Sequence, residues 1–279
     1  MPSCGDCWNN PQMTINVPLN RWVVLTAAVL VTAVPVAAGP AAAQADRPDP
    51  ARALKRQLKN EHGVRTSETA RVIFSKKSEG GFRIKGSVQL GSSGAVATDF
   101  TWRDIPKPGA EKAASHRVIR VGKDVYYDSG QDSGAIPDGK TWTRRNLSAG
   151  LTRYIAPTAS LQPFNVYDPS MLKAVLTRST TTPVSGGFLY RGTISYKELS
   201  KISTGGYINR FTGTPVNKKS KGTISWRLWA DRGGLLKRLY TTDALGAGKD
   251  PAIMRVDTRY TGWGFHLVIA APPADEVMD

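Results

Sequence analysis

The sequence contains few of the residues that cross-link small secreted proteins or bind metal ions. Among 279 residues there are two cysteines, Cys4 and Cys7, and three histidines, His62, His116 and His266. Two cysteines cannot form a multi-disulfide scaffold, and three dispersed histidines do not make a metal centre. Acidic residues are also scarce, because 22 of them face 38 lysines and arginines and leave a net charge of +16. We therefore predict no metal and no cofactor, and the positive charge bears on the partners of the protein.

The one long apolar run lies near the N-terminus, at residues 23–38. Arg21 precedes this run, Pro35 interrupts it, and small residues follow it. A basic flank, an apolar centre and a small-residue ending are typical of a secretory signal peptide. A membrane-spanning helix needs about 20 apolar residues, and a signal that stays uncleaved as an anchor is the alternative. We predict a signal peptide over residues 1–45 and a single secreted domain, extracellular or in the cell envelope, over residues 46–279.

The first twenty residues do not fit the start of a signal peptide, because they contain no lysine or arginine. Cys4 and Cys7 have the C-x-x-C spacing of half a redox or metal site, but nothing later in the sequence supplies the other half. We interpret this stretch as a mis-assigned extension upstream of a start near Met13.

Beyond the signal, most segments alternate apolar and polar residues, which is typical of half-buried strands. Strands are predicted at residues 69–76, 82–90, 96–102, 116–121, 124–127, 140–145, 188–196, 223–230, 235–242, 253–261 and 265–270, with turns at 78–81 and 91–94. Asp49-Pro50 and Asp168-Pro169 each supply an N-cap and a first-turn proline, so helices are predicted from 51 to about 60 and after 169, the second one ending at 180–183. A short helix is predicted at 197–203 and a mobile basic loop at 204–221.

This pattern predicts an α+β fold. About ten strands in one antiparallel sheet tend to curl, and such sheets place helices against their apolar face. We expect a curved antiparallel sheet, an incomplete β-barrel, with a few helices on its concave face.

Several motifs suggest chemistry but lack the context that the chemistry needs. Residues 134–141 fit the phosphate-loop pattern, yet a strand rather than a helix is predicted to follow them. Two D-S-G triplets begin at Asp128 and Asp132, too close together to form the paired carboxylates of an aspartic protease. The same loop, with Asp138, lacks regular calcium-ligand spacing. No G-x-S-x-G motif is present, so we predict that the protein is not an enzyme.

Five short segments resemble a known family. They are WRLWADRGGLLKRL at 226–239, RYTGWG at 259–264, APPADEV at 271–277, VYY at 125–127 and KTW at 140–142. Together they resemble the LolA/LppX-like exported proteins of actinobacterial envelopes, a family related in fold to the outer-membrane lipoprotein carrier. The resemblance covers most of residues 50–279. It implies an incomplete antiparallel barrel whose helices line a hydrophobic cavity that takes acyl chains.

Two departures from this family limit what is carried over. Many of its members begin the mature chain with a lipidated cysteine, whereas residues 44–46 here are Gln, Ala and Asp. The family also has no fixed ligand motif, so it assigns no binding residue.

We therefore predict an exported carrier that binds a lipid or another hydrophobic small molecule. Its ligand-lining residues are predicted on the inward faces of the strands and of the second helix: Phe100, Trp102, Met171, Leu172, Val175, Leu176, Trp226 and Leu228. The alternative is an envelope sensor or protein-interaction module whose half-barrel is filled by its own side chains. Basic pairs spread along the chain, such as Arg144-Arg145 and Lys237-Arg238, form a solvated basic surface, or alternatively one that is attracted to an anionic membrane or cell-wall surface. Nucleic acid is not expected.

Overall fold

The computed structural model describes residues 47–75, 78–105, 113–128, 137–146, 160–202, 207–208, 215–216, 221–245 and 252–278. All of them belong to one compact unit, Asp46–Asp279. The predicted signal peptide and both cysteines lie outside the described residues. Within the described part of the chain, no helix is long and apolar enough to cross a membrane.

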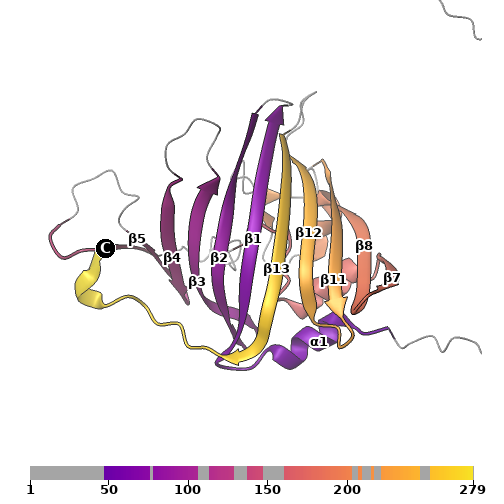
Figure 1. Ribbon diagram of the computed structural model, residues 1–279, viewed down its shortest axis with the longest axis horizontal. Coiled ribbons are helices and arrows are strands. Elements are labelled where there is room, and N and C mark those ends of the chain that lie inside the picture. The colour runs from indigo at the N-terminus through magenta and orange to yellow at the C-terminus, as the bar shows by residue number, and fades with distance from the viewer. Residues whose placement is uncertain are drawn as a thin grey trace, which may run out of the picture. The chain divides into compact units, whose positions relative to one another are not determined.

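A 12-stranded sheet with the order β14-β6-β5-β4-β3-β2-β1-β13-β12-β11-β8-β7 forms the body of this unit (Figure 1). Its strands are β1 (His62–Ser75), β2 (Ser78–Gly91), β3 (Gly94–Ile105), β4 (Ser115–Val121), β5 (Asp124–Asp128), β6 (Trp142–Asn146), β7 (Thr180–Val184), β8 (Gly187–Ser195), β11 (Thr223–Asp231), β12 (Leu236–Leu245), β13 (Ala252–His266) and β14 (Val277–Met278). Neighbouring strands are antiparallel except β14 and β6, which are parallel. The sheet is open, with β14 and β7 at its edges. The predicted curved antiparallel α+β fold is confirmed.

The three α-helices begin within one residue of their predicted starts, whereas a short 3-10 turn near the C-terminus was not predicted. They are α1 (Pro50–Gln57), α3 (Pro169–Leu176), α4 (Tyr196–Ile202) and a short 3-10 turn, η2 (Ala274–Glu276). The Asp49 carboxylate accepts hydrogen bonds from the amides of Ala51 and Arg52, and Asp168 does the same for Ser170 and Met171. These bonds satisfy amides that a helix start leaves without partners. The first helix ends at Gln57, earlier than the predicted residue 60.

Three predicted boundaries are wrong. Residues 78–81 belong to β2 rather than to a turn, because the β1–β2 ladder continues to Ser75 opposite Ser78. Residues 180–183 form the edge strand β7, where Pro183 is tolerated because an edge strand need not donate every amide. Residues 253–261 and 265–270 are not two strands, since β13 continues to His266 and no strand follows until β14.

Two glycines explain why β13 passes through a stretch that looks like a turn. Gly262 and Gly264 have φ angles of 62° and 81°, which glycine adopts without strain. The β1–β13 register shifts between Gly63 and Arg65, opposite this stretch. The glycines therefore bend the strand at an irregularity instead of ending it.

The predicted loop at 204–221 contains a two-stranded ladder. Its strands are β9 (Tyr207–Ile208) and β10 (Pro215–Val216). Most of the remaining residues of that loop lie outside the described part of the chain.

We call the side of the sheet that packs against the helices the inner face. It carries Val64 of β1, Ile84 of β2, Leu228 of β11 and Leu239 of β12, each 0% exposed. Leu54 of α1 belongs to the same hydrophobic cluster, as do Leu172 of α3 and Leu199 of α4. The opposite side, which bears the alternate residues of the same strands, is called the outer face.

Candidate functional site

All eight predicted ligand-lining residues lie together. Phe100, Met171, Leu172, Val175, Trp226 and Leu228 are buried members of the inner-face cluster, and Trp102 and Leu176 pack against it partly buried. The structure therefore brings β3, α3 and β11 to one apolar region, as expected. Contact between these residues and a ligand stays a prediction.

A buried carboxylate that the sequence analysis missed lies in the middle of the inner face. Glu68 of β1 is 2% exposed. It accepts hydrogen bonds from Ser160 Oγ at 2.5 Å, the Leu161 amide at 2.7 Å and Thr258 Oγ1 at 2.6 Å. Buried carboxylates need such partners because their desolvation is costly. Glu68 thus fixes the segment that precedes α3 to the sheet.

Gln162 makes a second attachment beside the first. Its Nε2 donates to the Leu239 carbonyl at 3.1 Å and to Thr258 Oγ1 at 2.8 Å. Its Oε1 accepts from Thr241 Oγ1 at 2.8 Å. Residues 160–162 therefore bridge β1, β12 and β13 and fill the centre of the inner face with the protein's own polar groups.

Two buried tyrosines, one on the inner face and one in the segment that packs on it, have hydroxyl groups whose pKa is raised by their surroundings. Tyr167 and Tyr260 are 3% and 1% exposed, and their rings lie edge to face at 6.4 Å. Burial is the main cause that raises the pKa of each hydroxyl above its ordinary value of 10, and the charge of Glu68 adds to it.

The part of the inner face formed by β3, β4 and β5 has a different character. The ring of Trp102 packs edge to face on that of Phe82, with 5.9 Å between the ring centroids, and it stacks on the ring of His116, with 6.1 Å between the centroids. Val118 and Val125 form a small buried cluster with Trp102 and Tyr127. We call Trp102, Val118, Arg120, Val125 and Tyr127 the β3–β5 site.

Arg120 is the unusual member of this site. It is 7% exposed, and burial lowers the pKa of its guanidinium. Its Nε donates to the Gly122 carbonyl at 2.9 Å, but its Nη1 is buried and has no hydrogen-bond partner among the described residues, and the same holds for Trp102 Nε1. Buried donors are nearly always satisfied in proteins, so this cation lies where an acidic ligand group can complete its bonding.

The catalytic motifs do not form a site in the described residues. Of the phosphate-loop pattern, Lys140 donates to the Asp275 carbonyl at 2.9 Å, Thr141 donates to Glu276 at 2.8 Å, and strand β6 follows rather than a helix. Asp128 accepts a bond from the Arg117 amide, and residues 129–136, which hold the other acidic residue of the D-S-G pair, lie outside the described part. No group of three His, Cys, Asp or Glu residues in the described ranges could hold a metal ion.

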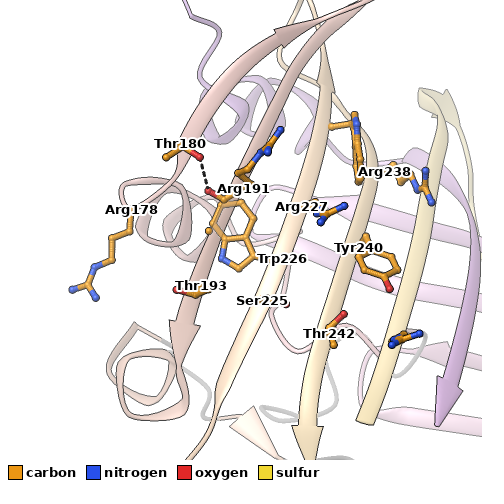
Figure 2. A pocket seen from close by; sticks show the side chains of 13 residues that line it. Arg178, Thr180, Arg191, Thr193, Ser225, Trp226, Arg227, Arg238, Tyr240 and Thr242 are labelled. Carbon is orange, nitrogen blue, oxygen red and sulfur yellow. Dashed lines mark hydrogen bonds between the residues drawn. The ribbon is translucent and has the colours of Figure 1, made fainter. Parts of the chain in front are cut away.

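A hollow of about 780 Å³ lies on the outer face over β8, β11 and β12 (Figure 2). Five arginines line it together with hydroxyl and aromatic side chains, and no described carboxylate does: the lining is Arg178, Thr180, Arg191, Gly192, Thr193, Ser225, Trp226, Arg227, Trp229, Arg238, Tyr240, Thr242 and Arg255. The sequence analysis missed this site, because it considered basic pairs adjacent in sequence. The signal it could have used is an arginine among the solvent-facing residues of each of the strands β8, β11, β12 and β13.

No family model matches the chain, and no curated protein matches it. Among solved structures, it is similar to a LolA superfamily protein from Nitrosomonas europaea, at 7% identity over 79% of this chain and 93% of that one, with a TM-score of 0.30. It is also similar to the MucA/MucB complex of Pseudomonas aeruginosa, at 15% identity over 82% and 60% of the two chains and a TM-score of 0.30. A third similar structure is a domain assigned to outer membrane lipoprotein sorting from Vibrio parahaemolyticus, at 10% identity over 76% and 89%, with a TM-score of 0.22. These low scores do not assign the chain to a family, and no family-model or curated-protein match supports the actinobacterial LppX-like group.

Proposed function

We propose that this protein is an exported carrier of the cell envelope, not an enzyme, which holds a lipid or another hydrophobic molecule against the inner face of its sheet. The observation behind the proposal is the single apolar cluster between the sheet and α1, α3 and α4. An acyl chain that joins such a surface gains about 0.8 kcal/mol for each methylene removed from water.

The margin of the cluster offers a place for this contact. Large apolar residues that pack against the cluster stay partly exposed: Phe82, Trp102, Leu161, Leu176, Phe188, Ile202 and Trp263. Trp102 is the member of this margin that also belongs to the β3–β5 site. We therefore place the ligand at the β3–β5 site.

The same site favours a ligand with an acidic head group. Arg120 lies opposite Thr98 in the β3–β4 ladder and opposite Val125 in the β4–β5 ladder, and its Nη1 is buried without a partner among the described residues. A charge-assisted hydrogen bond from a guanidinium is stronger than one between neutral groups. A carboxylate or phosphate on the ligand would satisfy this donor while the acyl chain lies on Val118, Tyr127 and Trp102.

The test compares a long-chain fatty acid with the corresponding fatty alcohol, using the full chain. Wild-type protein should bind the acid more tightly, and Arg120→Met should weaken acid binding by about tenfold, the effect of one charge-assisted hydrogen bond, while alcohol binding stays unchanged. Arg117→Met removes an arginine from the outer face of the same strand and should change neither. Native mass spectrometry of protein from its own host should also show a bound amphiphile.

Two results would contradict parts of this proposal. A clean apo mass, together with no uptake of either ligand, would end the carrier function. Equal acid binding by wild type and Arg120→Met would leave the carrier but remove Arg120 from its site.

The second candidate is an interaction module with no ligand. It is favoured by the bonds of Glu68 and Gln162, which fill the centre of the inner face with residues 160–162. The apo mass and the absence of uptake are the results that this alternative predicts.

A further inference from the structure

Arginines face each other in pairs across the outer face of the sheet. The ladders place Arg191 opposite Arg227, Arg238 opposite Arg259, Arg255 opposite Arg71, and Arg83 opposite Arg103. Like charges directly opposite each other on neighbouring strands destabilise a sheet. Asp257 offsets the charge of Arg238 in one of these pairs, whereas Arg191 and Arg227 face each other in a hollow whose lining holds no described carboxylate. The Arg191–Arg227 pair therefore calls for a role other than stability.

The hollow in Figure 2 shows which of these cations are available to a ligand. Arg238 is held by Asp257 through two hydrogen bonds of 2.7 Å, and Arg178 is paired with Glu198. Arg191, Arg227 and Arg255 make no ion pair with a described carboxylate and line the hollow. A second hollow of about 470 Å³ shares Arg255 and Tyr240 with the first, and its lining also includes Asp257, the ion-pair partner of Arg238.

The length of this arrangement exceeds that of a small anion. The paired arginines extend over β8, β11, β12, β13, β1, β2 and β3, which are consecutive in the sheet. With strands about 4.8 Å apart, six steps cover roughly 29 Å. A single phosphate or carboxylate would use one pair, whereas an extended chain with repeated negative charges would use several.

Hydroxyl groups accompany the charges. Thr193 of β8, Ser225 of β11 and Thr242 of β12 are consecutive partners in the ladders, and they form a row beside the arginines in the hollow. Such side chains both donate and accept hydrogen bonds, as do the hydroxyl groups of sugars.

We infer that the outer face binds an extended anionic polysaccharide, whose carboxylate or phosphate groups lie between the paired arginines and whose hydroxyls contact the Thr–Ser row. Guanidinium groups bind both kinds of anion through two parallel hydrogen bonds. An anion between two opposing arginines also removes their repulsion. This site is on the opposite side of the sheet from the proposed carrier site and does not depend on it.

Two other polyanions fit the face less well. Nucleic-acid single strands use several aromatic faces on which bases stack. The hollow offers Tyr240 alone, because Arg238 lies over the ring of Trp229 at 4.9 Å and Trp226 is 2% exposed. A membrane is flat, whereas the sheet curves around the helices of its inner face (Figure 1), so a plane would contact only part of the band. A flexible polymer can follow the curvature.

The experiment measures dissociation constants for the full chain by isothermal titration calorimetry. The probes are polygalacturonate, neutral dextran of similar length, single-stranded DNA and phosphatidylglycerol vesicles. Polygalacturonate should bind most tightly and dextran not at all, and added salt should weaken the binding. The double variant Arg191→Gln/Arg227→Gln should bind polygalacturonate about tenfold more weakly, because charge-assisted hydrogen bonds are lost.

The matched control removes two positive charges elsewhere. Arg52→Gln/Lys55→Gln changes exposed residues of α1 and should lose less than about threefold, because distant surface charges are screened. Equal losses in the two double variants, or tighter binding to DNA or vesicles than to polygalacturonate, would overturn the inference. The outer-face variant should keep fatty-acid binding unchanged, which separates this test from that of the carrier function.

Discussion

The two faces of the sheet differ most clearly along β11. Leu228 is 0% exposed in the inner cluster, whereas its neighbour Arg227 is exposed and lies opposite Arg191 on β8. Burial of Leu228 on the inner face stabilises the fold. On the outer face, Arg227 and Arg191 repel each other, and an uncharged residue at either position would avoid this repulsion. The comparison shows that packing constrains the inner face, whereas the outer face carries charges that packing does not require.

The largest expected effect comes from the inner face. Leu228→Ala should lower the free energy of unfolding by about 2–5 kcal/mol, because it removes buried methyl groups and leaves a cavity. Ser225→Ala, three residues earlier on the outer face, should stay within about 0.5 kcal/mol of wild type. Chemical denaturation measures both, and similar losses would contradict the assignment of the faces.

A carboxylate on each face gives the next comparison. Glu68→Gln should cost about 1–3 kcal/mol, because its amide group would face the donors of Leu161 and Thr258 and leave one unpaired. Asp257→Asn on the outer face breaks the ion pair with Arg238 and should cost less than about 1 kcal/mol. If Asp257→Asn lowered the free energy of unfolding in urea more than Glu68→Gln did, the conclusion that Glu68 fixes residues 160–162 to the sheet would be wrong.

Alkaline pH tests the buried tyrosines. Below about pH 10 both the folded and the unfolded chain keep these hydroxyls protonated, so the ionisation of these tyrosines does not lower the stability there. Above pH 10 the unfolded chain ionises, while the raised pKa of Tyr167 and Tyr260 delays ionisation in the folded protein. Stability should therefore fall as the pH rises, by up to about 1.4 kcal/mol per pH unit for each group.

Tyr167→Phe removes one of these two groups. The free energy of unfolding should be measured between about pH 8 and pH 11, a range that includes the ordinary pKa of tyrosine. It should fall less steeply with pH in this variant than in wild type. The same slope in both proteins would mean that Tyr167 ionises normally in the folded state.

The smallest expected effect has the opposite sign. Arg191→Gln/Arg227→Gln should raise the free energy of unfolding by about 0.2–1 kcal/mol at low salt, because it removes a like-charge cross-strand pair. The gain should shrink at high ionic strength, and Arg52→Gln/Lys55→Gln should show no such gain. A destabilised outer-face variant would indicate that these arginines stabilise the sheet rather than repel each other.

Local features were predictable from the sequence. The Asp-Pro starts of α1 and α3 depend on a few adjacent residues, and the alternation in β2, β3 and β11 shows directly which side chains share a face. This is why the four strand residues predicted to line a ligand site lie on the inner face, while the four predicted residues of α3 pack in or against the same cluster. The errors at 78–81, at 180–183 and near Gly262 arise because glycine and proline usually end strands but are tolerated at irregularities and edges.

The features that depend on register were not predictable. Arg71 and Arg255 are far apart in the chain, and only the β1–β13 ladder places them opposite each other. Glu68 had a signal that was overlooked, since it lies in phase with the apolar Ala70 and Val72 of its own strand. Its partners Ser160 and Leu161 come from a segment without alternation, so no pattern could have indicated the contact.

The first and the last long strands of the chain, β1 and β13, lie side by side at the centre of the sheet (Figure 1). Their ladder extends from His62 opposite His266 to Ile73 opposite Ile253. Contacts of such long sequence separation slow folding, because a long loop must close before they form. During synthesis the N-terminal hairpins can form first, but the edge of β1 that pairs with β13 stays unpaired until β13 has been made. The protein should therefore fold late and slowly, and in that interval it would depend on chaperones to keep the unpaired strand from aggregating.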